Sequence, residues 1–106
     1  MSITFEEVKG ALKKGKTRIA SEAKVVITRN AGPASYATGG FDVTVGELGE
    51  IVAALVTADG GYTAEIDWDN SNKNTLRIKM YSGAGTEVTA GTGLDTVYVY
   101  IIAFGW

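Results

Sequence analysis

Residues 10–17 read GALKKGKT and match the G-x-x-x-x-G-K-[ST] pattern of a nucleotide-binding phosphate loop. Such a loop functions between a strand and the start of a helix, because its amides and the helix N-terminus together hold the phosphates. Here the preceding segment, TFEEVK, has helical features, and the following VVIT has the character of a strand. The order is reversed, so we interpret the match as the lysine-rich end of a helix.

An apolar run at residues 51–59, IVAALVTAD, ends in Asp59 and imitates the strand that holds magnesium in the same enzymes. Those strands belong to parallel sheets, whose crossover connections need about a dozen residues or more. The chain nowhere alternates helices with strands in this way. We therefore do not expect nucleotide hydrolysis.

A third pattern, DWDNSNKN, gives Asp67, Asp69 and Ser71 the spacing of the first calcium ligands in an EF-hand loop. However, Asn72 stands where the sharp turn needs glycine, and Ile78 stands where the bidentate glutamate is required. Asn and Ser are common in turns because their side chains imitate backbone hydrogen bonds. The pattern favours a turn over a calcium site.

Histidine and cysteine are both missing from the 106 residues. This excludes catalytic triads with histidine, thiolate metal sites and disulfides. The remaining carboxylates show no spacing that pairs them for acid–base chemistry. We therefore expect no enzymatic activity, no catalytic residue, no metal and no cofactor.

The composition, 45% hydrophobic and 21% charged, is ordinary for one globular domain over residues 1–106. No apolar run reaches the roughly 18–20 residues of a membrane-spanning helix. The first residues, MSITFEEVKG, lack the apolar core of a signal peptide. We expect neither a signal peptide nor a membrane partner.

The N-terminal part is predicted to be a basic arm. Thr4 and Glu7 can form a capping box for a short helix over residues 5–14, and Gly15 can end it. Residues 1–30 carry seven Lys/Arg and three Asp/Glu, a net +4, whereas residues 31–106 carry three and nine, a net −6. We interpret residues 1–17 as the arm and 18–106 as a β body; alternatively, the lysines only solubilise the surface. No aromatic residue interleaves them, so nucleic-acid binding is not favoured.

Beyond residue 17, apolar and polar residues alternate with period two in RIASEAKVVIT, FDVTV, YTAEIDW and TLRIKMY. This is typical of half-buried antiparallel strands. In the first segment, Val25 and Ile27 are expected on one face and Lys24 on the other. The prediction is an all-β fold: a single antiparallel β-sandwich or small barrel of about six or seven strands, with a short N-terminal helix or arm.

Two hairpins are expected. Asp59-Gly60-Gly61 would join strands 51–58 and 62–68, and DNSNKN would join 62–68 to 75–81. In the second hairpin, the apolar pattern pairs Trp68 with Leu76 and Ile66 with Ile78, all inward. The same register sets two ion pairs on the wet face, Asp67 with Arg77 and Glu65 with Lys79.

Two strands, IVAALVTA (51–58) and TVYVYIIAFGW (96–106), are apolar on both faces. A small sandwich has one buried layer, so the second face needs another cover: the N-terminal helix, a long loop or another chain. Tyrosine and tryptophan favour an interface, because their rings bury apolar area while keeping a polar tip.

Three stretches, SYATGGFDV (35–43), ADGGYTAEIDWDN (58–70) and VYIIAFG (99–105), resemble small β-rich virion structural proteins of tailed bacteriophages. These are proteins of the capsid decoration or cement kind. The resemblance covers about residues 35–105 and does not include the basic N-terminus. It implies a non-enzymatic protein, made in the host cytoplasm and located on the capsid surface of the virion.

The implied partners are the major capsid protein and copies of the chain itself, with no small-molecule substrate. We expect the interface to use these residues of the arm and the last strand: Lys13, Lys14, Lys16, Arg18, Tyr98, Tyr100, Phe104 and Trp106. The alternative is a carbohydrate- or receptor-binding β-sandwich module of a tail fibre, presenting Tyr36, Tyr62 or Trp68. The predicted inward direction of Tyr62 and Trp68 argues against that alternative.

Overall fold

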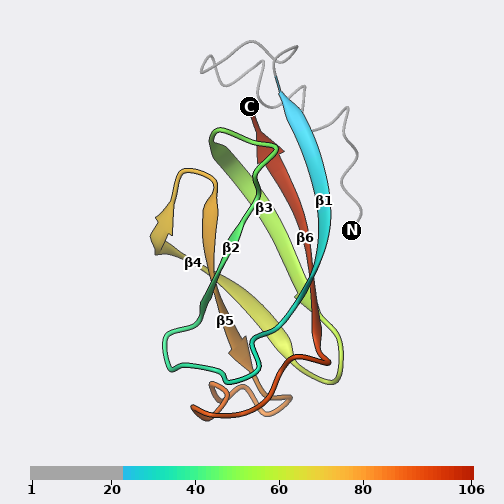
Figure 1. Ribbon diagram of the computed structural model, residues 1–106, viewed down its shortest axis with the longest axis vertical. Coiled ribbons are helices and arrows are strands. Elements are labelled where there is room, and N and C mark those ends of the chain that lie inside the picture. Colours follow the sequence, from blue (N-terminus) through green and yellow to red (C-terminus); the bar gives the residue numbers. More distant parts are fainter. Residues whose placement is uncertain (1–22) are drawn as a thin grey trace.

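The computed structural model describes residues 23–106. Its elements are β1 (Lys24–Ala31), β2 (Phe41–Thr44), β3 (Ile51–Ala58), β4 (Thr63–Asn72), β5 (Thr75–Tyr81) and β6 (Tyr98–Gly105). They form two three-stranded antiparallel sheets: sheet A in the order β1-β6-β3, and sheet B in the order β2-β5-β4 (Figure 1). The predicted all-β, sandwich-like fold is confirmed. The predicted helix over residues 5–14 and the phosphate-loop pattern lie outside the described residues.

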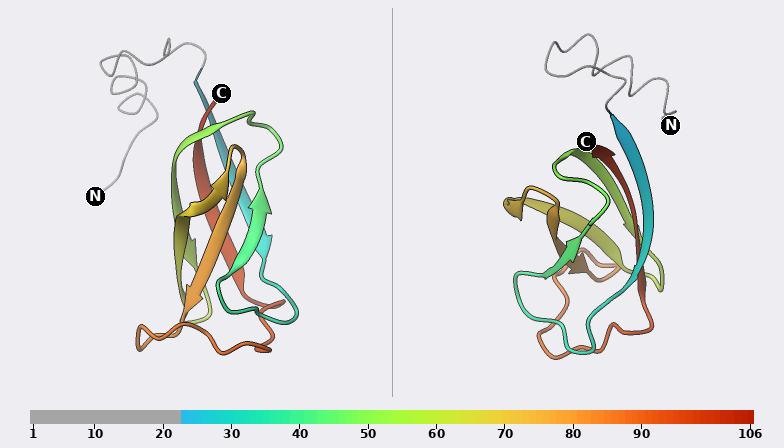
Figure 2. Two further views of the ribbon diagram at one scale, coloured as in Figure 1. Left: turned by 90° about the vertical axis from the view of Figure 1, so that its left-hand side faces the viewer. Right: turned by 45° about the horizontal axis from the view of Figure 1, so that its top comes forward.

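The two sheets face each other as layers, and most connections between consecutive strands cross from one sheet to the other (Figure 2). Only β4 and β5 are consecutive strands that pair within one sheet. Their two-residue turn, Lys73-Asn74, contains a left-handed residue, with a φ of 51° at Lys73. No helix among the described residues is long and apolar enough to cross a membrane.

The core lies between the sheets and follows the period-two alternation of the two central strands. The alternating buried residues are Leu76, Ile78 and Met80 in β5, and Val99, Ile101 and Ala103 in β6. Residues that alternate in this way point to one face of a sheet, so the intervening residues of β6 must point away from the core.

The predicted hairpin between residues 51–58 and 62–68 is wrong. The turn at Asp59 is present, and the Tyr62 amide donates to the Asp59 carbonyl oxygen at 3.3 Å. However, β3 pairs with β6 in sheet A, whereas β4 pairs with β5 in sheet B. The two strands without a polar face are therefore neighbours in one sheet, because long-range matching of their side chains outweighs the local turn signal.

The predicted pairing of β4 with β5 is confirmed at Glu65–Lys79, Ile66–Ile78 and Asp67–Arg77. It fails at Trp68, because the register shifts between Asp67 and Asn72 and the indole is 49% exposed. Such a bulge adds residues to one strand and redirects its side chains. Neither of the two ion pairs expected across these strands forms among the described residues.

Arg77 pairs with the neighbouring strand on its other side. Its Nε lies 2.7 Å from a carboxylate oxygen of Asp42 in β2, and this is the only salt bridge within the described residues. The Asp67 carboxylate accepts instead from the side-chain amide of Asn70, at 2.7 Å, within the bulge. The charge pattern thus gave the correct register but not the actual partners.

A hydrogen-bonded cluster of Tyr36, Glu87, Gly39 and Met80 connects the two long loops at one end of the sandwich. The Tyr36 hydroxyl donates to Glu87 at 2.8 Å and accepts from the Met80 amide at 3.1 Å. The same Glu87 oxygen accepts from the Gly39 amide at 2.9 Å. Tyr36 and Gly39 of the stretch SYATGGFDV thus belong to this loop junction.

Candidate interaction surface

The outer face of sheet A is apolar along most of its length. Three cross-strand rows can be followed from β1 through β6 to β3: Val25–Phe104–Ala53, Ile27–Ile102–Leu55 and Arg29–Tyr100–Thr57. The first two rows contain no polar side chain. We call the six residues of these two rows the apolar face.

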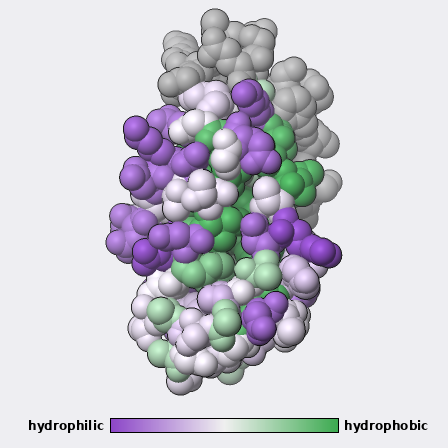
Figure 3. Space-filling view, viewed as in Figure 1, coloured by the Kyte–Doolittle hydropathy of each residue, from purple (hydrophilic) through white to green (hydrophobic). Residues whose placement is uncertain are grey.

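Two members of the apolar face are strongly solvent-exposed: Ile27 is 75% exposed and Leu55 is 47% exposed. In contrast, Phe104 is only 7% exposed, although it does not belong to the core cluster. In Figure 3, hydrophobic residues run along the middle and the upper right, and most hydrophilic residues lie on the left, over β4. The strongly exposed residues of the apolar face thus lie on the edge strands β1 and β3 of sheet A.

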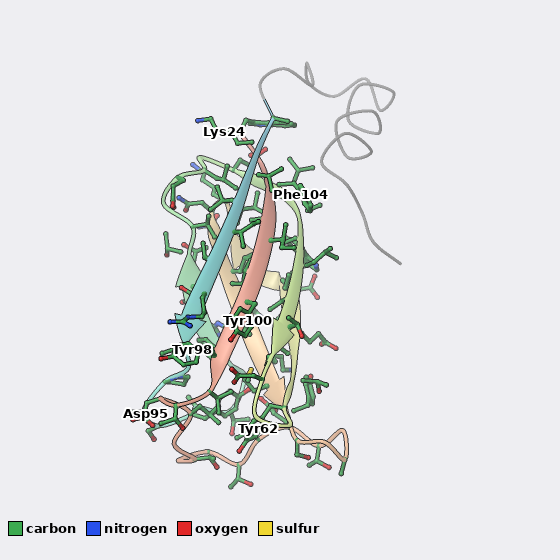
Figure 4. The ribbon with its side chains drawn as sticks, turned by 90° about the vertical axis from the view of Figure 1, so that its right-hand side faces the viewer. Lys24, Tyr62, Asp95, Tyr98, Tyr100 and Phe104 are labelled. Carbon is green, nitrogen blue, oxygen red and sulfur yellow. The ribbon has the colours of Figure 1, made fainter. Side chains whose placement is uncertain are left out.

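An aromatic end with polar partners borders the apolar face. Tyr98 and Tyr100 follow each other along β6 and, with Phe104, mark the side of sheet A that faces the viewer in Figure 4. The Arg29 guanidinium lies 4.4 Å from the centre of the Tyr98 ring, a favourable cation–π distance. Asp59 accepts from the Tyr98 amide at 2.9 Å and from the Tyr100 hydroxyl at 3.2 Å. The Asp59 carboxylate therefore holds both the backbone and a side chain of β6 at this end.

Sheet B presents the opposite kind of surface. Its outward positions carry Asp42 and Thr44 on β2, Arg77 and Lys79 on β5, and Glu65 on β4. The hydroxyls of Thr44 and Thr75 lie 2.9 Å apart. One outer face of the sandwich is charged and hydrogen-bonded, and the other is apolar.

Val25 and Ile27 share one face of β1 as expected, but it is the outer face of sheet A and not the core face. Val26 packs against the core, whereas Val25 and Ile27, its odd-numbered neighbours, point outward. The run Val25-Val26-Ile27 is apolar at every position, so period two cannot distinguish its faces. The sequence therefore missed Ile27, the most exposed large apolar residue of the described chain. Leu55 could be anticipated because its strand has no polar face.

The structure places the four predicted interface residues of the C-terminal strand in different environments. Tyr98 and Tyr100 lie at the aromatic end, and Phe104 is a buried residue within the first row of the apolar face. Trp106 is half-buried, and its carbonyl oxygen accepts from the amides of Gly49 and Glu50 at 2.8 and 3.1 Å. The four basic residues of the predicted arm, Lys13, Lys14, Lys16 and Arg18, lie outside the described residues.

Two hydrogen-bonded carboxylates of the described residues, Glu87 and Asp67, have lowered pKa values. The pKa of Glu87 is lowered by the Gly39 amide and by the Tyr36 hydroxyl, and that of Asp67 mainly by the Asn70 amide. Burial raises the pKa of Tyr36 from 10.0 to about 12. The Glu87 carboxylate accepts its hydrogen bonds in the loop junction, and the Asp67 carboxylate accepts its hydrogen bond in the bulge of β4. We therefore interpret both as structural groups.

Comparison of the chain with family models, curated proteins and solved structures found no match.

Proposed function

We propose that this chain is a non-enzymatic structural protein of a virion that decorates or cements a tailed-bacteriophage capsid. The single observation that carries the proposal is the outer face of sheet A, with Ile27 and Leu55 exposed at the two ends of one apolar row. Contiguous apolar patches on a protein surface mark sites of contact with other molecules. The resemblance of residues 35–105 to virion proteins supplies the kind of contact.

The proposed attachment surface combines three parts. The apolar face would bury hydrophobic area, and the aromatic end with Tyr98 and Tyr100 would add rings with hydrogen-bonding tips. The basic arm around Lys13, Lys14, Lys16 and Arg18 would steer the chain to an acidic shell, because opposite charges accelerate association. The partners would be the major capsid protein and other copies of the chain, on the outside of the capsid.

The direct test is co-sedimentation with capsid shells that lack the chain, assembled from the major capsid protein of the proposed phage. We expect the full chain to pellet with the shells and the double variant Ile27→Lys/Leu55→Lys to remain in solution. The control is Thr63→Lys, at an exposed position of β4 in sheet B, which should pellet like the parent chain. If the parent chain stays in the supernatant at every concentration tested, it is no decoration protein.

A second candidate is the carbohydrate- or receptor-binding module, and the exposure of Trp68 favours it. The indole projects from the bulge in β4, beside the exposed polar residues Asp69 and Asn70. Sugars stack on exposed aromatic rings and bind nearby amides and carboxylates. The other two predicted aromatics fit less well, because Tyr36 is 1% exposed and Tyr62 packs against the core.

A glycan array distinguishes this second candidate. Binding of the parent chain that is lost in Trp68→Ala but kept in Tyr100→Ala would favour the module. If no glycan is retained, or if Trp68→Ala binds as well as the parent, the sugar-binding candidate is wrong.

A further inference from the structure

β1 is an edge strand of sheet A, and its outer edge is open among the described residues. It pairs with β6 along all of its positions, Lys24–Ala31, without a register shift, and it pairs with no other described strand (Figure 1). An open edge offers a row of unpaired amides and carbonyl oxygens to a further strand. The strand, KVVITRNA, contains no proline or glycine that would interrupt such pairing.

The other three edges of the two sheets are shortened or interrupted. β2 has only four residues. The register of β4 shifts between Asp67 and Asn72, and that of β3 shifts between Ile51 and Ala53. The Ile51 amide also already donates to the Lys73 carbonyl oxygen, at 2.9 Å. Short strands and bulges keep sheet edges from pairing, so β1 is the edge best suited to accept a further strand.

The backbone groups at the open edge of β1 belong to residues whose side chains lie on the outer face of sheet A. The Gly32 amide, one residue past β1, donates to the Val97 carbonyl oxygen at 2.8 Å. Hydrogen-bonded pairs alternate along an antiparallel ladder, so the even-numbered residues of β1 bond to β6. The amides and carbonyl oxygens of Val25, Ile27 and Arg29 therefore point to the open edge, beside the exposed Ile27 side chain.

A second copy of the chain fits this edge better than it fits the apolar face. Three strands about 4.8 Å apart, and five residues at about 3.4 Å each, give a face on the order of 250 Å². A stable interface between two proteins usually buries about 800 Å² on each partner, so the packing of two apolar faces alone would be too small. Strand addition at an edge instead derives its affinity from main-chain hydrogen bonds.

The sequence of β1 is also compatible with antiparallel pairing to itself. When Ile27 lies opposite the partner's Ile27, Lys24 lies opposite the partner's Asn30. In the same register Arg29 lies opposite the partner's Val25. No like charges then face each other, and like charges directly opposite would destabilise a strand pair. The centre of the strand, residues 25–28, carries no charge at all.

We propose that two copies of this chain pair antiparallel along β1, about a two-fold axis at Ile27, and thereby join their two sheets A into one continuous sheet. Val25, Ile27 and Arg29 exchange about six backbone hydrogen bonds with the same residues of the partner. The row Ile27–Ile102–Leu55 continues into the same row of the partner, so the apolar face widens from about 14 to about 29 Å. This inference names the contact between copies within the proposed function, on which its role at a capsid rests, but the pairing forms in the free protein.

Single engineered cysteines test the pairing in the full chain, which has no cysteine of its own. In the proposed dimer, the two Ile27 Cα atoms lie about 5.5 Å apart, within the limit of about 7 Å for a disulfide. The matched controls are Arg29→Cys, whose two copies would lie about 13 Å apart along the strands, and Leu55→Cys on the opposite edge strand. Under mild oxidation, Ile27→Cys should form a covalent dimer about tenfold faster than either control.

Any other order of the three cross-linking rates overturns the proposal. Faster linkage of Arg29→Cys would mean a different register, and linkage of Leu55→Cys as fast as that of Ile27→Cys would mean that two apolar faces pack together. Equal rates or no covalent dimer at all would mean that β1 does not pair with a second copy. Capsid binding by a chain that stays monomeric would contradict this inference alone, and a β1 dimer that does not bind capsids would contradict only the proposed function.

Proline at the open edge gives a second test that needs no cysteine. Ile27→Pro removes an amide that faces the partner but leaves the ladder with β6 intact, because proline is tolerated where the amide points away from the sheet. Sedimentation equilibrium of the full chain should show dimers for the parent and for the control Ile27→Val, and a monomer for Ile27→Pro at the same concentration. Circular dichroism checks that both variants keep the sandwich. A monomeric parent chain, or an Ile27→Pro variant that is as dimeric as the parent, would overturn the proposal.

Discussion

At the scale of single residues, the clearest feature is the Tyr36 hydroxyl, which serves two parts of the fold at once. It donates to Glu87 and accepts from the Met80 amide, at 2.8 and 3.1 Å. Met80 is fully buried in the central strand of sheet B. The backbone amide of a buried strand residue is thus satisfied by a side chain from a loop 44 residues earlier in the chain.

Removing this hydroxyl should destabilise the protein. In Tyr36→Phe, the Met80 amide loses its acceptor, and an unsatisfied buried donor costs about 1–3 kcal/mol in the free energy of unfolding. The measurement is urea denaturation followed by tryptophan fluorescence. The control is Tyr62→Phe, whose hydroxyl makes no hydrogen bond within the described residues, and it should change the midpoint little. Equal midpoints for the two variants would show that the hydrogen bond from the Met80 amide to the Tyr36 hydroxyl does not stabilise the fold.

Glu87 should make the stability depend on pH on the acid side. Its pKa is lower in the folded protein than the ordinary value of 4.5, mainly because the Gly39 amide and the Tyr36 hydroxyl donate to the carboxylate. The folded state therefore binds this proton more weakly than the unfolded chain. The stabilisation is present above pH 4.5 and is lost as the pH falls through the lower folded value.

The variant Glu87→Gln should flatten this acid dependence, because the amide has no proton to gain. Part of the slope should remain, because the pKa of Asp67 is lowered as well. The measurement is the denaturation midpoint between pH 7 and pH 2, with the exposed Glu47→Gln as the control. An unchanged slope in Glu87→Gln would show that this carboxylate does not contribute.

At the scale of the elements, the sequence predicted what depends on local alternation and missed what depends on neighbours in space. Strands β4 and β5 were found with their register because one polar face fixes the direction of each. The partner of β3 was missed because its turn, Asp59-Gly60-Gly61, looks the same whether the chain continues in one sheet or crosses to the other. Trp68 was misplaced because nothing in the alternation reveals a bulge.

In the candidate surface, too, the sequence predicted what depends on local alternation and missed what depends on neighbours in space. The sequence shows two strands without a polar face, which predicts that one apolar surface needs a cover. In the structure these strands, β3 and β6, pair with each other, so this surface is the outer face of sheet A. Val25, Val26 and Ile27 are all apolar, so the sequence does not show which of them enters the core. In the structure Val26 packs against the core, and Ile27 is therefore exposed. The predicted tyrosines lie beside the apolar face, at its aromatic end.

The start of β2 depends on one glycine. Gly40 has a φ of +106°, which side chains rarely allow, and an added Cβ would collide with the Ile78 carbonyl group. We expect Gly40→Ala to lower the free energy of unfolding by more than about 1 kcal/mol, because both strain and collision act at this position. Gly46→Ala is the matched control, since its Cβ would meet open space without a positive φ. Similar denaturation midpoints for the two variants would contradict this account.

At the scale of the whole molecule, the sandwich has two unlike faces and an uneven charge. Sheet B is charged on its outer side, with the Asp42–Arg77 salt bridge, and sheet A is apolar. The positive charge of the chain gathers in residues 1–30, at a net +4, against −6 in residues 31–106. A protein with a net charge of −2 can therefore present a basic side to an acidic partner.

Ion-exchange chromatography tests this charge asymmetry on the free protein. We expect a cation exchanger at pH 7 and low salt to retain the full chain despite its net negative charge, because a clustered positive region can bind the resin by itself. Salt should release it, since screening shortens the reach of each charge to about 8 Å at physiological ionic strength.

Two variants with the same change in net charge separate local from global effects. Lys13→Glu/Lys14→Glu removes charge from the arm, whereas Lys73→Glu/Lys79→Glu removes the same charge from the β body. The arm variant should elute at clearly lower salt, because it destroys the densest basic stretch, and the body variant should elute close to the parent. If both variants shift equally, retention follows net charge alone, and the lysines of residues 1–17 only keep the protein soluble.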